Sequence, residues 1–321
     1  MPFFTVQYEG GPAAAVVRRA RPNPVSSRSR LPPTPYYPER SEMSSFTTSR
    51  RTVLALALSL FAAGAIAQAQ PAAKAEFVPE VGQSGKDVVW VPTAQGLVDR
   101  MLDMAKLTAK DIHYDLGSGD GRTVITAARR GAPAYGVEYN PDMVELSRRN
   151  AAKEKLAGKA TFIHGDIFET DFSKATVITL FLLPELNVKL RPKILDMKPG
   201  TRVVSNSFTM GDWKSDESQT AKGDCTSYCT AYLWIVPAKV AGVWKSGNEE
   251  YKFAQEYQMV HGSVGVAGKL APVLNGRLRG EDISFTAGPG RYAGKVSGDR
   301  IEGTVTAGGK TSPWVATRSG K

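Results

Sequence analysis

The stretch Asp115-Leu116-Gly117-Ser118-Gly119-Asp120-Gly121-Arg122 decides the fold of this chain. Its first two residues end the stretch 113–116, which is typical of a short buried strand, and it precedes residues 123–130, which have helical spacing. Glycines at such a junction let the backbone turn sharply and approach a ligand without a Cβ in the way. The stretch therefore predicts a ligand-binding loop between the first strand of an α/β sheet and the helix that follows it.

The spacing of the glycines disagrees with two common phosphate-binding loops. A dinucleotide fingerprint G-x-G-x-x-G begun at Gly117 needs glycine where Arg122 stands, and one begun at Gly119 needs it where Val124 stands. The loop also lacks the Lys-Ser/Thr pair of a P-loop. NAD and ATP are therefore poor fits. The G-x-G-x-G turn after an acid resembles instead motif I of class I S-adenosylmethionine (SAM) methyltransferases.

The residues around this loop, from about 87 to 237, alternate between helical and strand patterns. Strands separated by helices indicate a parallel sheet with helices on both faces, in a Rossmann-like α/β fold. We expect strands at 113–116, 134–138, 161–164, 176–182, 202–207 and 231–236, with helices near 98–107, 123–130, 143–155 and 188–195.

Three acids lie at the ends of three successive strands of the expected sheet. Because the carboxyl ends of parallel strands share one edge, Asp115, Glu138 and Asp166 should lie along the edge where open α/β sheets bind ligands. SAM is a cationic sulfonium with an amino acid and an adenosine and no phosphate. Asp115 could face its amino group, Glu138 its ribose hydroxyls, and Asp166 its adenine amine, while Ile167 packs on the ring.

A narrower resemblance covers residues 88–215. They are similar to the small class I lysine methyltransferases that modify the mitochondrial adenine-nucleotide translocase and the ATP synthase c-subunit, and to bacterial relatives of these enzymes. The matching pieces are Trp90-Val91-Pro92-Thr93, residues 115–122, Gly136-Val137-Glu138-Tyr139-Asn140-Pro141, Asp166-Ile167-Phe168, Phe181-Leu182-Leu183-Pro184, and residues 199–208 with Trp213. The resemblance implies SAM as cofactor, bound by Asp115, Gly117, Gly119, Gly121, Glu138, Asp166 and Ile167.

The same resemblance implies an acceptor channel lined by residues 181–184 and 90–93. Methyl transfer requires an aligned, neutral nucleophile, and an apolar channel disfavours the charged ammonium of a lysine. We therefore expect Phe181 and Pro184 to line the channel. Glu185 either orients the amine or only caps the helix that follows. Trp90 and Trp213 either wall the pocket or pack in an interface.

The region from about residue 238 to 321 has a different character. Glycine becomes dense, and short stretches alternate with a period of two residues at hairpin spacing, as in Tyr251, Phe253 and Tyr257. This pattern predicts an antiparallel β-meander of seven or eight strands, closed or nearly closed into a small barrel.

The first seventy residues are typical of a leader rather than a folded domain. Arg50 and Arg51 precede a short apolar run that ends in A-x-A sites, which indicates a secretory signal peptide of the Sec or twin-arginine type, with Met43 as the start. The apolar run has about 15 residues, fewer than a bilayer span needs. We expect a periplasmic protein with a linker at 71–86 and no integral membrane span in the mature chain. The alternative is an uncleaved N-terminal anchor.

Composition excludes several function classes. The net charge is +10 over 321 residues, but residues 1–70 hold eight arginines against three glutamates, so the rest of the chain carries only +5. That mild balance argues against a nucleic-acid partner. Two cysteines and three histidines cannot build a disulfide scaffold or a four-ligand zinc site, and no metal is expected. Cys225 and Cys229 form either a disulfide or two free thiols.

The sequence thus favours a SAM-dependent methyltransferase acting on a protein lysine. Two alternatives stay open. One is a small-molecule methyltransferase with the same fold. The other is a non-catalytic envelope protein with this fold, whose β-barrel binds a ligand.

Overall fold

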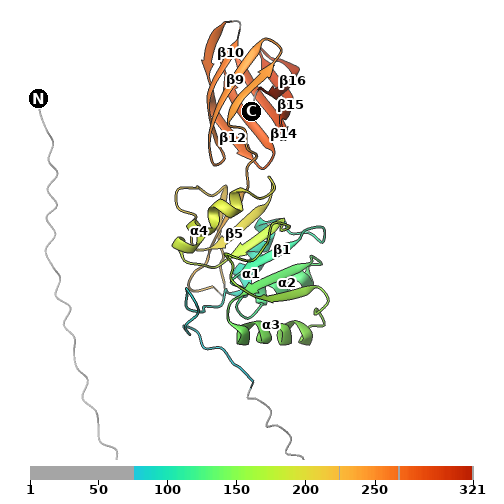
Figure 1. Cartoon of the computed structure of the whole chain (residues 1–321), viewed down its shortest axis with the longest axis vertical. Helices are drawn as coiled ribbons and strands as arrows, with labels where there is room; N and C mark the ends of the chain where they lie inside the picture. Colours follow the sequence, from blue (N-terminus) through green and yellow to red (C-terminus); the bar gives the residue numbers. More distant parts are fainter. Residues whose placement is uncertain (1–75, 224, 267, 320–321) are drawn as a thin grey trace, which may run out of the picture. The chain divides into compact units, whose positions relative to one another are not determined.

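The computed structural model describes residues 76–223, 225–266 and 268–319, which lie within one compact unit spanning 70–321 (Figure 1). The signal peptide, the alternative anchor and the first part of the linker lie outside the described residues. Within the described ranges, none of the helices is long and apolar enough to cross a lipid bilayer.

A seven-stranded sheet forms the centre of the first folded part, in the order β3-β2-β1-β4-β5-β7-β6. Strands β1 to β5 are parallel to one another and have the registers of a Rossmann-like sheet. The strands are β1 (His113–Leu116), β2 (Ala134–Glu138), β3 (Ala160–His164), β4 (Val177–Leu180), β5 (Arg202–Asn206), β6 (Glu217–Thr220) and β7 (Thr230–Ile235).

The two strands at one edge correct the expectation of a parallel sheet. Strand β7 runs antiparallel to β5, and β6, which the sequence pattern did not predict, runs antiparallel to β7. Only a short loop separates β6 from β7, so the two form a hairpin, and a hairpin is antiparallel. The expected Rossmann-like architecture holds for the five strands that carry the glycine loop and the acids.

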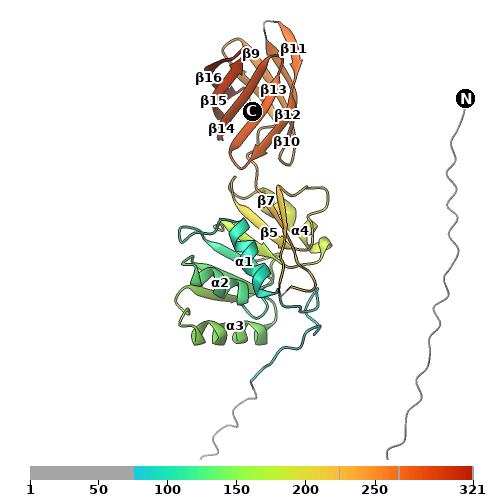
Figure 2. The same cartoon turned by 180° about the vertical axis from the view of Figure 1, so that it is seen from behind.

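Helices cover both faces of this sheet, as expected, and the described residues contain four of them (Figures 1 and 2). One face packs against the first three helices, with α1 on Val177 and Val204. The other face packs against the last helix, through Leu190 and Ile194. The helices are α1 (Gln95–Met104), α2 (Arg122–Arg129), α3 (Pro141–Lys153) and α4 (Pro184–Leu195).

The C-terminal strands form the barrel that the alternating pattern predicts. Eight antiparallel strands form a ring in the order β8-β9-β10-β12-β13-β14-β15-β16, and pairing of β16 with β8 closes it, while β11 pairs only with β10. The strands are β8 (Gly242–Ser246), β9 (Glu249–Glu256), β10 (Met259–Val266), β11 (Lys269–Pro272), β12 (Leu274–Arg279), β13 (Asp282–Ala287), β14 (Gly290–Ser297), β15 (Arg300–Ala307) and β16 (Lys310–Arg318).

Aromatic side chains fill the interior of the barrel. The rings of Phe285 and Tyr292 stack with centroids 4.6 Å apart, and Tyr251 and Trp314 contact both of them. These four residues are almost completely buried in a single cluster with aliphatic neighbours from the other strands. The interior is therefore a packed hydrophobic core rather than a ligand cavity.

Candidate functional site

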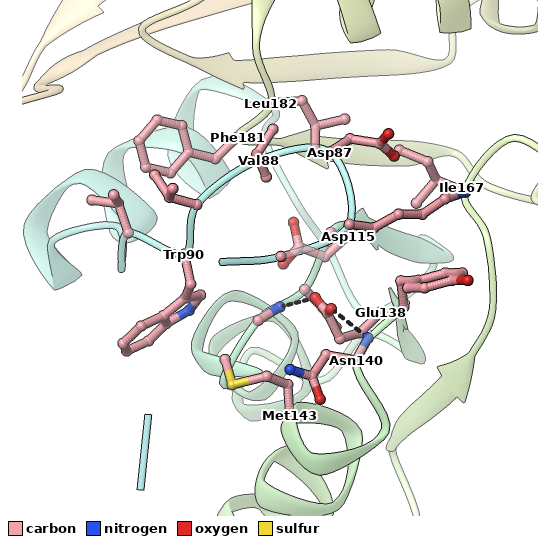
Figure 3. Close-up of a pocket in the computed structure, with 18 of the residues that line it drawn as sticks. Asp87, Val88, Trp90, Asp115, Glu138, Asn140, Met143, Ile167, Phe181 and Leu182 are labelled. Atoms are coloured by element: carbon pink, nitrogen blue, oxygen red, sulfur yellow. Dashed lines mark hydrogen bonds between the residues drawn. The ribbon is translucent and has the colours of Figure 1, made fainter. Parts of the chain in front are cut away.

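A cavity of about 540 Å³ lies at the carboxyl edge of the parallel strands (Figure 3). Its floor contains the glycine loop and the residues that follow β2 and β3. Its other walls come from the ends of β4 and β5 and from residues 83–93. The structure thus brings most of the predicted site residues to one cavity, namely Asp115, Gly117, Gly119, Glu138, Asp166, Ile167 and Phe181.

The glycine loop turns from β1 into α2 through left-handed backbone conformations. Gly117, Gly119 and Gly121 all have positive φ, and Gly121 is the N-cap of α2. Gly119 also meets a close neighbour, since a Cβ there would lie 2.7 Å from Trp90 Nε1. Only glycine meets both requirements without strain. Gly121 supports the turn from behind the cavity, against Phe162 and Ser147.

Asp115 is a buried carboxyl that faces the cavity from the end of β1 (Figure 3). Thr179 donates a hydrogen bond of 2.6 Å from Oγ1 to Asp115 Oδ1, and Thr179 Oγ1 lies 2.9 Å from His113 Nε2. Burial raises the pKa of Asp115, and so do the carboxylates of Asp120 and Glu138, while the hydrogen bond from Thr179 lowers it; the net result is a pKa of about 7. A cationic ligand group placed here would relieve this electrostatic penalty.

Glu138 is held in place by two backbone amides at the end of β2. Gly119 N–H donates to Oε2 and Asn140 N–H donates to Oε1, each at 2.9 Å (Figure 3). A carboxylate oxygen accepts about two hydrogen bonds, so each oxygen keeps capacity for one more donor. Because Glu138 also lines the cavity, that capacity is available to two adjacent ligand hydroxyls.

Asp166 lies after β3 and forms an ion pair that the sequence did not predict. Lys86 Nζ lies 2.5 Å from Asp166 Oδ2, and Phe168 N–H donates to Oδ1 at 2.9 Å. The hydrogen bond from Lys86 lowers the pKa of Asp166 and raises that of Lys86. Lys86 also lies 4.7 Å from the centre of the Tyr139 ring. Ile167 borders the cavity beside this pair, where it can contact a planar ring.

The segment that carries Lys86 forms a small hairpin at the cavity, which we call the cover hairpin (residues 82–90). Gly82 N–H donates to Trp90 O and Trp90 N–H donates to Gln83 O, at 2.8 and 2.9 Å. Ser84 and Val89 form an antiparallel bridge between the two arms. Sequence reasoning assigned residues 71–86 to a linker and missed this element, because its short arms have no clear alternation. Trp90 was expected either to wall the pocket or to pack in an interface, and it lines the cavity.

Aromatic residues form the wall of the cavity at the ends of β4 and β5. Phe181 stacks on Phe208 with centroids 6.1 Å apart, and Tyr228, from the loop between β6 and β7, contacts both rings. All three line the cavity together with Leu182 and Leu183. The sequence pointed to Phe181, but it gave no signal for Phe208 and Tyr228.

Three other candidates lie apart from the cavity lining. Pro184 opens α4, and Glu185 is exposed in the first turn of that helix, whose N-cap is Leu183 and which has no side-chain capping hydrogen bond. Trp213 is buried in the core beside Trp234, whose Nε1 donates to Trp213 O at 2.8 Å. Trp213 was expected either to wall the pocket or to pack against other residues, and the structure shows that it packs.

Cys225 and Cys229 are joined by a disulfide in the loop between β6 and β7. The sequence left open whether they are bonded or free. The disulfide closes a ring of five residues that includes Tyr228.

Comparison with known proteins agrees with the geometry. Residues 115–217 match the ANTKMT methyltransferase domain family. A protein-lysine N-methyltransferase of Saccharolobus islandicus is 41% identical over 152 residues, which is 46% of this chain and 94% of that protein. The ATP synthase c-subunit lysine N-methyltransferase of Rattus norvegicus is 32% identical over 130 residues, 40% of this chain but only 60% of the rat protein.

Among solved structures, an RNA methyltransferase from Salinibacter ruber in complex with S-adenosyl-L-homocysteine is 47% identical, with a TM-score of 0.44 over 47% of this chain and 96% of that one. The resemblance inferred from the motifs is confirmed by the family match and by the archaeal relative. The chain belongs to the family of SAM-dependent methyltransferases that contains the ANTKMT domain and the protein-lysine N-methyltransferase of Saccharolobus islandicus.

Proposed function

We propose that this protein transfers a methyl group from SAM to a lysine side chain of another protein. The observation that carries the proposal is the position of Asp115, Glu138 and Asp166 on one cavity, at the ends of three neighbouring parallel strands. The names of its relatives support lysine as the acceptor. The apolar wall of Phe181, Leu182 and Phe208 supports it too, because such a wall favours a neutral amine.

The cavity residues fit the amino group and the ribose of SAM. Asp115 is a buried acid whose strongest charged neighbours are also acids, so a cationic amino group fits there. Glu138 can accept two further hydrogen bonds, which fits a ribose diol. The glycine loop leaves room beside the backbone for the body of the cofactor.

When bound, SAM supplies the methyl group: the lone pair of a neutral amine forms the new N–C bond as the S–C bond breaks, the electron pair stays on sulfur, and water takes the proton of the new ammonium. The protein's own contribution is binding and alignment. Leu182, Phe181 and Phe208 exclude water beside the acceptor amine, and the cover hairpin excludes it on the cofactor side. No general base is required, since the apolar wall lowers the pKa of the incoming lysine.

Isothermal titration of the full chain with SAM tests the cofactor part. We expect binding by the wild type and at least about tenfold weaker binding by Asp115→Ala and Glu138→Ala, because each variant loses a charged hydrogen-bonding partner. Absence of binding by the wild type would refute the proposal.

Labelling tests the acceptor part. The full chain is incubated with methyl-labelled SAM and envelope extract, and the label is then traced to protein, lipid or small solutes. Label in protein lysines supports the proposal, whereas label in small solutes alone supports a small-molecule methyltransferase.

We also propose that the protein is exported. The arginine pair and apolar run before residue 71 support this, as does the Cys225–Cys229 disulfide, since disulfides persist mainly in oxidising compartments. Cell fractionation with mass spectrometry of the mature chain tests it. A full-length chain in the cytoplasm would contradict export, and a full-length chain in the membrane fraction would indicate the anchored alternative.

A further inference from the structure

Three aromatic rings meet at one end of the cavity, and each comes from a different element. Phe181 follows β4, Phe208 follows β5, and Tyr228 lies in the loop between β6 and β7. Their ring centroids are 5.4 to 6.1 Å apart in all three pairs. We call these residues the aromatic triad.

The order of the strands separates the triad from the acids. Asp115 and Glu138 lie near the carboxyl ends of β1 and β2, and Asp166 follows β3. On the other side of β1 in the sheet, Phe181 follows β4, Phe208 follows β5 and Tyr228 lies in the loop of the β6–β7 hairpin. Since the acids fit the polar groups of the cofactor, the triad lies on the side of the cavity that is left for the acceptor.

Tyr228 is held in an unusual conformation for an exposed residue. Its φ is +55°, in the left-handed region that few non-glycine residues adopt, and 47% of its surface is exposed. The Cys225–Cys229 disulfide closes the chain around it, and Ala221 N–H donates to Cys229 O at 2.8 Å at the base of the loop. Backbone strain persists only where the surroundings impose it, and it concentrates at functional sites. Tyr228 thus combines a left-handed backbone, a position inside a disulfide-closed loop and ring contacts with Phe181 and Phe208.

Aromatic faces attract cations, and clustered rings bind lysine ammonium and methylammonium groups. We infer that the aromatic triad receives the acceptor lysine and its methylated products, and that Tyr228, positioned by the Cys225–Cys229 disulfide, determines specificity for this cationic side chain. The inference rests on the proposed function and adds two residues and a covalent clamp to it. The lysine binds as its ammonium at the exposed ring of Tyr228. The ammonium gives its proton to water before transfer, and the neutral amine that reacts lies deeper, beside Leu182.

The test measures binding rather than turnover, so it does not require the natural acceptor. The full chain, saturated with S-adenosyl-L-homocysteine, is titrated with Nα-acetyl-Nε-trimethyl-lysine methylamide. A parallel titration uses its neutral analogue with a tert-butyl group in place of trimethylammonium. We expect the cation to bind more tightly than the neutral analogue.

Substitution of Tyr228 gives the decisive comparison. Tyr228→Ala should weaken binding of the cation by about fivefold, which corresponds to about 1 kcal/mol for a cation–aromatic contact, while Tyr228→Phe keeps it. Leu270→Ala, at an exposed position on β11 of the barrel, is the control and should change nothing. Affinity for S-adenosyl-L-homocysteine should be the same in all variants, which also shows that they fold.

The disulfide is tested in the same assay. The Cys225→Ser/Cys229→Ser double variant, or wild type reduced with dithiothreitol, should lose as much affinity for the cation as Tyr228→Ala does. Unchanged binding in these samples would overturn the role of the clamp.

Other outcomes separate the two proposals. Equal binding of the cation and its neutral analogue, or no effect of Tyr228→Ala, overturns the role of the triad while the cofactor site stands. Failure of the wild type to bind S-adenosyl-L-homocysteine refutes the proposed function, and this inference with it.

Discussion

Replacing Thr179 by valine tests whether Asp115 must ionise before the cofactor binds. Thr179 donates its hydroxyl proton to Asp115 Oδ1 at 2.6 Å, and this bond favours the ionised carboxylate. Valine has nearly the same shape and no hydroxyl, so the variant should raise the pKa of Asp115. A protonated Asp115 cannot pair with a cationic amino group, so the variant should bind the cofactor more weakly near neutral pH.

The expected size of the effect depends on pH. The pKa of Asp115 in the wild type is about 7, so about half of the protein is ready to bind at pH 7. If the lost hydrogen bond stabilises the carboxylate by about 1.5 kcal/mol, binding weakens about sevenfold at pH 7 and about twofold at pH 8. The pKa of the neighbouring His113 is lowered to about 3 by burial, so this residue stays neutral throughout the experiment.

The assay is calorimetric titration with S-adenosyl-L-homocysteine between pH 5.5 and 8, in pairs of buffers with different ionisation enthalpies. Below pH 7 the wild type should release close to one proton on binding, and its affinity should rise about tenfold per pH unit. In Thr179→Val, the rise of affinity with pH and the release of a proton on binding should continue to higher pH than in the wild type.

Thr179→Ser is the matched control, because it keeps the hydroxyl and should retain the wild-type pH profile. Identical profiles for the wild type and the valine variant would refute the reasoning. So would binding by the wild type without release of a proton at pH 6, since Asp115 would then not be protonated in the free protein.

Three further predictions concern the same cavity. Glu138→Gln should weaken cofactor binding by about 10- to 100-fold in calorimetry, because the amide turns one acceptor into a donor facing the N–H of Gly119 or Asn140; an unchanged affinity would show that the carboxylate is not a ligand. Lys86→Met removes the ion pair with Asp166 and should speed both association and dissociation of S-adenosyl-L-homocysteine, by up to about fivefold in stopped-flow fluorescence; unchanged rates would contradict a role of this pair in retaining the cofactor. Asp115→Asn should stabilise the cofactor-free protein at pH 8, because a carboxyl with a raised pKa destabilises the fold progressively as the pH rises from about 4, its ordinary pKa, to about 7; the gain is about 2–4 kcal/mol, or at least about 4 °C in Tm, and it should fall to about 1.5 kcal/mol at pH 5 and vanish near pH 3.

The parallel strands could be predicted closely from the sequence because they are buried. Strand β1 was predicted at the bounds that the structure has, and so was β2, since β1 leads directly into a glycine-rich turn and both lie between segments with helical spacing. Strand β6 was missed because Glu217–Thr220 is a polar, partly exposed stretch at the edge of the sheet. An edge strand is defined by its partner, and local hydrophobicity does not reveal it.

The two halves of the cavity also differed in how well their residues could be predicted from the sequence. The acids could be predicted because each follows a recognisable strand, and parallel topology places them together. Tyr228 could not, because its position depends on β6, on the antiparallel turn into β7 and on a disulfide between residues only four apart. Lys86 was equally out of reach, since its partner Asp166 lies 80 residues away and the cover hairpin has no periodic signal.

The dense interior of the C-terminal barrel has a consequence for how that part of the molecule can be used. Tyr251, Phe285, Tyr292 and Trp314 pack together in one buried cluster, so side chains of the barrel itself occupy its interior. A binding partner of the barrel must therefore contact the outward-pointing side chains of its strands, which alternate along each strand with the inward-pointing ones. Residues at those outward positions can be substituted, for labelling or for attachment to a surface, without changing the buried residues that form the core of the barrel.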